Sequence, residues 1–237
     1  MLQAIDLTKR YDHGELALDA LNLTVSEGEI VFLLGANGAG KTTTLNLFLN
    51  FISPTSGKAL IDGLDSVHQS QETKRHLSYI SENVMLYGDF TARENMEFFA
   101  RLSGKKPTRE ACYNLMRKVG LKENDFEKRL KIFSKGMRQK VGLACILQKD
   151  TPNILMDEPT SGLDPKSAAD LMNILLELRA EGKSVLLCTH DLFRARGVAD
   201  RIGIMKEGRL VMVRHREEFL NDDLERIYLE YMQETAL

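Results

Sequence analysis

The chain has 237 residues, of which 43 % are hydrophobic, and its 32 basic and 34 acidic residues give a formal net charge of −2 at pH 7. This length and composition predict one folding unit, an α/β core with a smaller subdomain, rather than two independent domains. The balanced charge gives no reason to expect a nucleic-acid partner, which normally leaves a basic stripe in the sequence, so we expect no nucleic acid.

Composition also bears on location. Residues 1–6 lack the charged and then apolar pattern of a secretory signal, and no apolar run approaches the roughly 18 to 20 residues that span a bilayer. The three cysteines are too few for a disulfide framework, and Cys145 and Cys188 fall in apolar runs where reduced cysteines pack as small hydrophobic residues. We therefore expect a cytoplasmic protein.

The first segment, up to about residue 28, alternates strand-like pieces with a polar turn. Residues 2–9 and 16–25 lie on either side of Asp12-His13-Gly14, and residues 57–62 add another piece. Such short strands around a turn predict a small antiparallel β-subdomain.

A glycine-rich segment follows a buried-type strand. The apolar run at residues 30–34 leads into Gly35 to Thr42, and a helix-compatible pattern follows. Glycines there let backbone N–H groups face phosphates, Lys41 supplies a positive charge for the β- and γ-phosphates, and the hydroxyl of Thr42 suits Mg²⁺. The alternative is a glycine-rich turn before an ordinary helix, but every fixed position of the motif is present. The expected ATP-binding residues are Gly35, Ala36, Asn37, Gly38, Ala39, Gly40, Lys41, Thr42 and Thr43.

The middle of the chain is helical in pattern. Residues 94–102, 109–119 and 137–148 each show helical periodicity. These patterns predict a helical subdomain at 83–150, between two parts of the nucleotide-binding core at 1–82 and 151–237.

The run Phe133-Ser134-Lys135-Gly136-Met137 places a Ser-x-Gly stretch at a helix start. Exposed N–H groups and the positive end of the helix dipole attract anions there. Because the chain already has a phosphate site at 35–42, a second site indicates a second molecule. We expect Ser134 and Gly136 to contact ATP held by another copy of the chain, in a head-to-tail dimer.

Two carboxylates end the next apolar strand, at the edge where parallel sheets place their ligand chemistry. After residues 154–156 come Asp157, expected to hold the metal, and Glu158, expected to polarise the attacking water. An isolated Asp-Glu pair is more often a solvated loop, but Pro159-Thr160-Ser161-Gly162-Leu163-Asp164 follows at once. Asp164 also suits the N-cap of a helix that starts at Pro165.

The last third predicts a helix, a strand and a hairpin. Leucines at 171, 175 and 178 give an apolar helix face, and residues 184–188 form a strand that leads to Thr189 and His190. An isolated histidine is more often structural, but at this edge of a sheet we expect a catalytic role for His190. Residues 201–205 and 210–213 predict a hairpin, and 217–232 a closing helix.

With these residues in place, the chain resembles the nucleotide-binding subunit of ATP-binding cassette (ABC) transporters, from Leu7-Thr8-Lys9-Arg10-Tyr11 to the final hairpin. The resemblance implies an α/β fold: a RecA-like P-loop core with an antiparallel β-subdomain and an inserted α-helical subdomain. It implies that Tyr11 stacks on adenine, that residues 35–42 are the Walker A motif and that residues 133–137 are the signature. It also implies that Asp157 and Glu158 are the Walker B motif with its catalytic glutamate. Residues 161–164 then correspond to the D-loop, and His190 corresponds to the switch histidine. Lys41, Glu158 and His190 are then the catalytic residues, and Asp164 joins the ATP site.

Two departures from the commonest family pattern narrow the resemblance. Glu82 takes the place of the usual glutamine, where a carboxylate can be a further Mg²⁺ ligand beside Thr42 and Asp157, and Lys135 takes the place of a glycine in the signature. Ser-Lys-Gly-Met signatures with Glu at the glutamine position resemble the ATPases of ABC-2 type exporters, which serve a separate six-helix permease. The resemblance therefore implies a peripheral protein on the inner face of the cell membrane.

Residues 84–90 are rich in apolar side chains where this family receives its permease. Permease docking and core packing both account for Met85, Leu86, Tyr87 and Phe90. Two other functions are compatible with an ABC cassette: a soluble ABC ATPase acting on a macromolecular complex, and a module that binds ATP without hydrolysing it. The single cassette without a coiled-coil insertion disfavours the first, and the presence of Glu158 and His190 disfavours the second.

Overall fold

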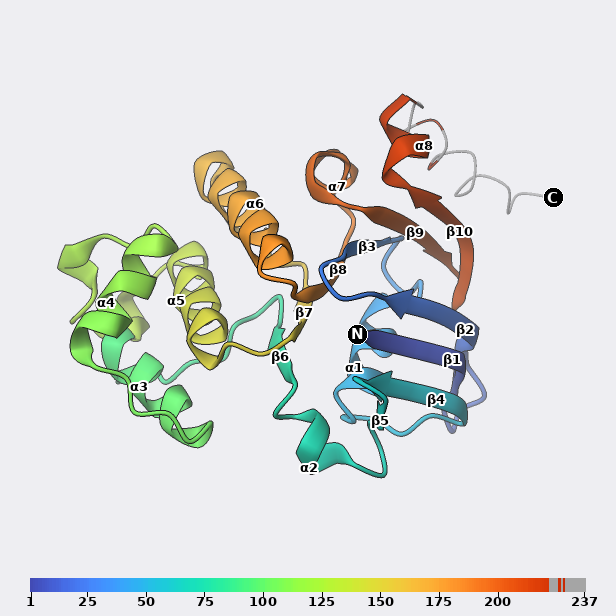
Figure 1. Cartoon of the computed structure of the whole chain (residues 1–237), viewed down its shortest axis with the longest axis horizontal. Coiled ribbons are helices and arrows are strands. Elements are labelled where there is room, and N and C mark those ends of the chain that lie inside the picture. Colours follow the sequence, from blue (N-terminus) through green and yellow to red (C-terminus); the bar gives the residue numbers. More distant parts are fainter. Residues whose placement is uncertain (222–225, 227, 229–237) are drawn as a thin grey trace.

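The structure is a computed structural model, and it describes residues 1–221, 226 and 228. The strands are β1 (Leu2–Arg10), β2 (Leu16–Val25), β3 (Ile30–Leu34), β4 (Ser56–Ile61), β5 (Leu64–Asp65), β6 (Leu77–Ile80), β7 (Asn153–Asp157), β8 (Ser184–Thr189), β9 (Arg201–Lys206) and β10 (Arg209–His215). The helices are α1 (Lys41–Phe48), α2 (Ser70–Thr73), α3 (Ala92–Leu102), α4 (Arg109–Lys118), α5 (Lys135–Lys149), α6 (Pro165–Ala180), α7 (Leu192–Val198) and α8 (Arg216–Asn221). Helices α3, α4 and α5 gather at one end of the molecule, and the smaller β-sheet lies at the other (Figure 1).

The larger sheet positions the site. Within the described residues its strand order is β10-β9-β3-β8-β7-β6, with β9, β3, β8, β7 and β6 parallel and β10 antiparallel at one edge. Because β3, β8 and β7 are adjacent and parallel, their carboxyl ends meet at one edge. The glycine-rich segment, Thr189 and Asp157 come from these three ends.

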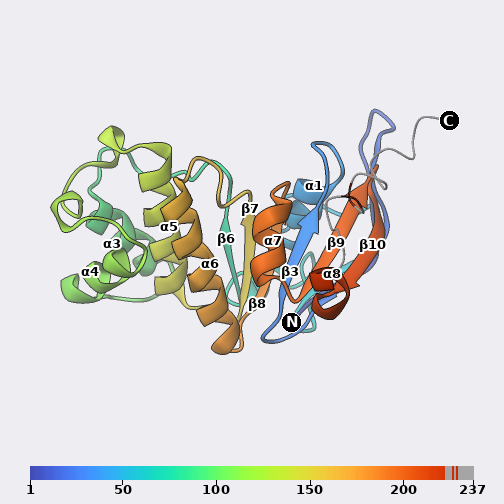
Figure 2. The same cartoon turned by 90° about the horizontal axis from the view of Figure 1, so that it is seen from above.

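Side chains alternate between the two faces of this sheet, and both faces are buried by elements packed against them. In β3, Phe32 and Leu34 join a core with α6 and α7, whereas Val31 and Leu33 join a second core with α1. That second core also holds the inner faces of β1, β2 and β4, so α1 packs between the two sheets (Figure 2). The smaller sheet, in the order β2-β1-β4-β5, is antiparallel, as the sequence predicts.

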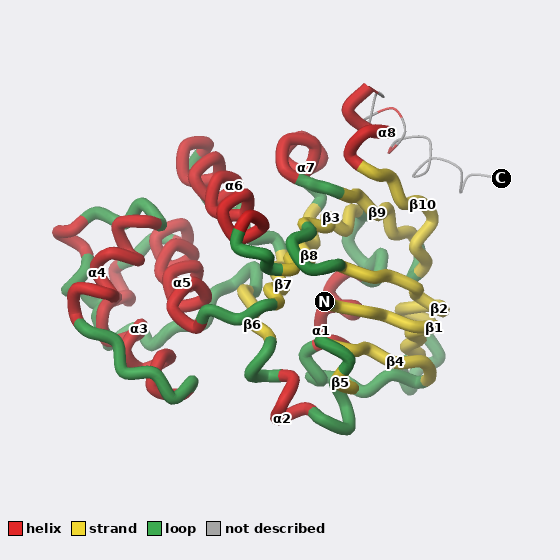
Figure 3. Tube along the Cα trace, in the orientation of Figure 1, coloured by secondary structure: helices red, strands yellow, loops and turns green. Residues whose placement is uncertain are grey.

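Helices α3 to α5 form a separate group beside β6 (Figure 3). Local sequence explains where two of them begin: Thr91 and Glu94 form a reciprocal capping box at α3, and Thr108 caps α4. Cys112, Met116, Val141 and Ala144 bury the faces between α4 and α5. None of the helices in the part of the chain that the structure describes has the length and hydropathy of a membrane-spanning segment.

Two core elements were not anticipated from the sequence, β6 and α7. The expected closing helix at 217–232 corresponds to α8 in its first part. From residue 222 on, that prediction lies outside the described residues except for positions 226 and 228.

Candidate functional site

The glycine-rich segment from Gly35 to Thr42 connects β3 to α1, and two of its glycines are required by their surroundings. A Cβ at Gly35 would lie 2.5 Å from the carbonyl oxygen of Met205. Gly40 caps α1 with φ of 104°, and a Cβ there would lie 2.7 Å from the carbonyl oxygen of Ala17. Any larger residue would push the loop away from these strands, so the glycines fix the path of the backbone.

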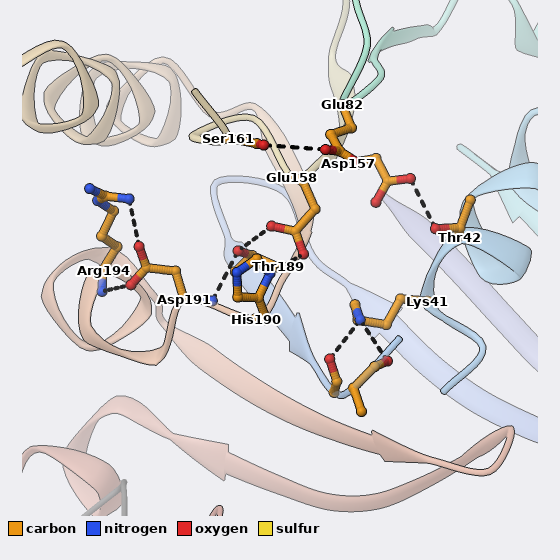
Figure 4. A network of polar contacts seen from close by, with 12 residues as sticks. Lys41, Thr42, Glu82, Asp157, Glu158, Ser161, Thr189, His190, Asp191 and Arg194 are labelled. Carbon is orange, nitrogen blue, oxygen red and sulfur yellow. Dashed lines mark hydrogen bonds and ion pairs between the residues drawn. The ribbon is translucent and has the colours of Figure 1, made fainter. Parts of the chain in front are cut away.

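Lys41 begins α1 with its ammonium group held inside the loop. Its Nζ donates hydrogen bonds to the carbonyl oxygens of Gly35, at 2.6 Å, and Ala36, at 3.0 Å, and only 6 % of the residue is exposed (Figure 4). A buried positive charge next to the N-terminus of a helix is an anion site. The loop thus has the charge and the N–H groups to bind phosphate.

Thr42 and Asp157 meet across the sheet edge. Thr42 Oγ1 donates a hydrogen bond of 3.0 Å to Asp157 Oδ2. Burial raises the pKa of the Asp157 carboxyl above its ordinary value, although the hydrogen bond from Thr42 opposes this. Burial of the Tyr79 hydroxyl, with a contribution from the charge of Asp157, raises the pKa of Tyr79 to about 12. A hydroxyl and a carboxylate, both oxygen donors, fit a small hard cation such as Mg²⁺.

Glu158 is held by the strand next to its own. Its backbone N–H donates a 2.9 Å hydrogen bond to the carbonyl oxygen of Cys188. The backbone of Glu158 has a φ of 44°, in the left-handed region that glycine favours. Its Oε2 accepts a 2.8 Å hydrogen bond from Thr189 Oγ1, and its Oε1 lies 2.8 Å from His190 Nδ1 (Figure 4). The Glu158 side chain is 14 % exposed, whereas His190 is 70 % exposed. The carboxylate is therefore fixed, and the imidazole faces solvent beside it.

Thr189 follows the strand predicted at residues 184–188, and no functional role was predicted for it. Its hydroxyl donates to Glu158 and also accepts from Asp191 N–H at 3.1 Å. Its position directly before His190, at the end of a strand, is the sequence feature that could have indicated this role.

Glu82 is engaged by two residues outside the Thr42–Asp157 pair. Its Oε1 lies 3.1 Å from Lys135 Nζ and 3.2 Å from Ser161 Oγ. These contacts, that of Lys135 first, lower the pKa of Glu82 below its ordinary value.

The signature residues lie away from the phosphate loop of the same chain. Ser134 is exposed and caps α5, where its Oγ accepts a 3.3 Å hydrogen bond from Met137 N–H. Gly136 packs on the loop after Glu158, since a Cβ there would lie 3.0 Å from Gly162 O. In Figures 1 and 2, α5 and α1 lie on opposite sides of β6.

Tyr11 and Asp164 occupy the two remaining predicted positions. Tyr11 lies in the turn between β1 and β2, with its ring stacked on His13 at 5.8 Å and Lys9 Nζ 5.4 Å from the ring centroid. Asp164 caps α6, accepting from Ser167 N–H at 3.0 Å, so the predicted N-cap is confirmed.

Residues 84–90 divide between the surface and the core. Met85 is 85 % exposed, Tyr87 49 % and Phe90 38 %, whereas Leu86 packs against the core. Core packing therefore accounts for Leu86 alone of these four. The ring of Tyr87 lies 5.2 Å from Phe90, 4.8 Å from Phe98 and 6.2 Å from Phe99.

The family model described as ABC transporter matches residues 18–161. That is more than half of the chain, and the chain therefore belongs to the ABC transporter family. It is an ATP-binding subunit with ATPase activity coupled to transport, and the predicted α/β P-loop fold is confirmed.

Relatives with transport names cover most of the chain. The ABC transporter ATP-binding protein NatA of Bacillus subtilis is 32 % identical over 89 % of this chain and 88 % of its own length. The bacitracin transport ATP-binding protein BcrA of Bacillus licheniformis is 33 % identical over 98 % of this chain and 74 % of its own length. The osmoprotectant import ATP-binding protein OsmV of Salmonella typhimurium is 33 % identical over 93 % of this chain and 60 % of its own length.

Solved structures agree on the fold. An ATP-binding subunit of an ABC transporter superimposes with a TM-score of 0.88 at 30 % identity, covering 98 % of this chain and 100 % of the other. The dimeric post-hydrolysis structure of the cassette MJ0796, bound to ADP and Pi, gives a TM-score of 0.84 at 28 % identity over 91 % of this chain and 99 % of that one.

Proposed function

We propose that two copies of this chain bind two ATP molecules head to tail between them and drive export through a separate membrane permease. The observation that supports this most directly is Glu158, a nearly buried carboxylate held by Thr189 and His190 at the same sheet edge as the phosphate loop. A fixed carboxylate beside a phosphate site suits orientation of an attacking water.

In this mechanism the phosphate loop and two of the three predicted metal ligands hold the substrate. Lys41 and the N–H groups of residues 35–43 bind the β- and γ-phosphates, and Tyr11 stacks on adenine. Thr42 Oγ1 and Asp157 would hold Mg²⁺, which when bound neutralises phosphate charge. Metal contact through Glu82 would require its present contacts with Lys135 and Ser161 to open.

Hydrolysis then depends on Glu158 and His190. Glu158 orients a water for attack on the γ-phosphorus, the bond to the β,γ-bridging oxygen breaks, and ADP and inorganic phosphate leave. His190 is exposed beside Glu158, and in this mechanism it binds the γ-phosphate. The two side chains are within hydrogen-bond distance of each other, and this contact holds the general base Glu158 in position beside His190.

The dimer follows from the position of the signature. Ser134 and Gly136 start α5, which β6 separates from α1 of the same chain. A head-to-tail partner can supply them to the γ-phosphate, together with Asp164. The cassette MJ0796 is dimeric in its ADP- and Pi-bound structure, which supports a dimer of this chain.

The proposal of export is based on two residues, and the proposal of a permease partner is based on exposed apolar side chains. Lys135 and Glu82 resemble the sub-pattern of ABC-2 type exporters. BcrA is named for bacitracin transport, whereas OsmV is named for osmoprotectant import. Met85, Tyr87 and Phe90 form an exposed apolar patch that suits a permease helix. The ATPase is then peripheral on the inner face of the cell membrane.

The test uses Glu158→Gln. This variant should bind ATP, lose turnover, and form a dimer with Mg-ATP that light scattering after size exclusion detects. Ser134→Ala in the same background should weaken the dimer while leaving ATP binding by the monomer intact. Thr108→Ala is the matched control, because it also removes a helix cap, a 3.2 Å bond to Ala111 N–H, in the same subdomain.

Two results would reject this function. A strictly monomeric Glu158→Gln protein at saturating Mg-ATP, alone and with its permease, would exclude the shared site. Purification from native membranes without a multi-helix subunit would favour the soluble role.

A further inference from the structure

Lys135 joins two other segments of its own chain. Its Nζ lies 3.1 Å from Glu82 Oε1 and 2.9 Å from Ser161 Oγ, and Ser161 Oγ in turn donates to Glu82 Oε1 at 3.2 Å. We call Glu82, Lys135 and Ser161 the Lys135 cluster. The stem of Lys135 also packs on Gly162, where a Cβ would lie 3.0 Å from Lys135 Cδ and φ is 79°.

The Lys135 cluster connects two parts of the site, the signature at the start of α5 and the loop that follows Glu158. Lys135 stands between Ser134 and Gly136 at the start of α5, and Ser161 follows shortly after Glu158. The backbone N–H of Ser161 donates to Glu158 O at 3.0 Å. One side chain therefore ties the signature to the loop that carries Glu158.

In the proposed head-to-tail dimer, Ser134 of a chain meets the ATP of its partner, whereas Glu158 of that chain acts on its own ATP. We propose that Lys135 is a positioning residue, which through Glu82 and Ser161 fixes the signature relative to the Glu158 loop and so prepares the chain for ATP-dependent closure. This inference rests on the proposed dimer.

Charge gives the cluster a second role. Glu82 adds a carboxylate two residues after the end of β6. Lys135 offsets that charge from the signature side. The two departures from the common family pattern thus contact each other, and neither glutamine at 82 nor glycine at 135 could form this ion pair.

The expected effect is moderate because the pair is half-exposed, with 40 % of the Lys135 and 47 % of the Glu82 side chain accessible. Exposed ion pairs typically change an equilibrium about two- to fivefold. A symmetric dimer contains the cluster twice, so the loss enters the dimerisation constant squared, about tenfold for a threefold effect per chain.

The experiment is a double-mutant cycle in the Glu158→Gln background, with ATP-driven dimerisation measured by sedimentation. Lys135→Met and Glu82→Gln should each weaken dimerisation about tenfold. The double variant should be no weaker than either single one, because both remove the same contact. Lys135→Arg should retain dimerisation, and ATP binding by the monomers of the two Lys135 variants should stay within about twofold.

A control pair also bridges the helical group and the core. Lys118 on α4 and Glu177 on α6 lie 2.7 Å apart, with side chains 36 % and 55 % exposed. Lys118→Met and Glu177→Gln should leave dimerisation unchanged, which separates positioning at the signature from general attachment of the helices.

Unchanged or strengthened dimerisation by Lys135→Met, or additive effects of Lys135→Met and Glu82→Gln, would overturn the inference while leaving the dimer intact. Failure of the Glu158→Gln parent to dimerise would instead reject the proposed function.

Discussion

His190 Nδ1 lies 2.8 Å from Glu158 Oε1, and the two side chains reach each other from the ends of adjacent parallel strands. Thr189 Oγ1 contacts the other oxygen of the same carboxylate at 2.8 Å. Both oxygens of Glu158 are therefore occupied, which limits its rotation and directs it within the site.

Thr189→Val should lower kcat about tenfold with little change in KM for ATP, because it frees one oxygen of Glu158 without touching the phosphate loop. Steady-state ATPase assays measure both constants. Ser184→Ala is the control at the other end of β8, where the buried hydroxyl has no hydrogen-bond partner in the described part of the chain. A normal kcat for Thr189→Val would remove the positioning role.

Asp157→Asn should abolish ATPase activity but raise the melting temperature of the nucleotide-free protein. Burial raises the pKa of Asp157, so the folded state favours the neutral acid and the ionised group destabilises the fold at neutral pH. A gain of about 1 kcal/mol corresponds to roughly 2–4 °C in Tm at this chain length.

Calorimetry from pH 7 downward checks this sign. As pH falls, wild-type Asp157 becomes protonated and the advantage of the asparagine variant should shrink. An advantage that is absent at pH 7, or that grows on acidification, would contradict the argument.

Glu127→Gln should destabilise the helical subdomain at neutral pH only. Hydrogen bonds from Arg93, at 2.7 Å, and from Tyr113 and Arg109 lower the pKa of Glu127 to about 2, despite some burial. The stabilisation is present above the ordinary value of 4.5 and is lost as pH falls towards about 2.

The side chain of Glu127 is 39 % exposed, so we expect the loss at pH 7 to be only about 0.5–1 kcal/mol. Chemical denaturation at pH 7 and at acid pH measures it. Glu110→Gln is the control, since Glu110 is 67 % exposed and pairs with Arg117 on the same helix. An equal loss at both pH values would show that charge is not responsible.

Replacing Met85 and Tyr87 by serine should reduce recovery of the permease with the ATPase from native membranes severalfold, while ATP hydrolysis by the isolated protein stays normal. Both side chains lie on the exposed apolar patch, and an interface loses most when its large apolar side chains are removed. Val211→Ser on β10, at the opposite end of the molecule, is the control. Undiminished recovery would place the docking surface elsewhere.

Much of the fold was predictable because its signals are local. The strand, loop and helix around Gly35 to Thr42, the capped helices α3 and α4, and the N-cap at Asp164 each depend on a few neighbouring residues. β6 escaped prediction because it is only four residues long, and its strand conformation depends on pairing with β7. α7 is seven residues long and packs mainly through Ala195 and Val198.

The sequence by itself determined the chemistry available to this protein: a phosphate loop, two carboxylates after a strand, a histidine after another, and a second anion-binding helix start. The tertiary structure decided which of these side chains meet. Thr42 contacts Asp157 across 115 positions of sequence, and Lys135 contacts Glu82 across 53. Such partners are set by strand order and helix packing, since a separation of this length along the chain does not determine the distance between two residues in the fold.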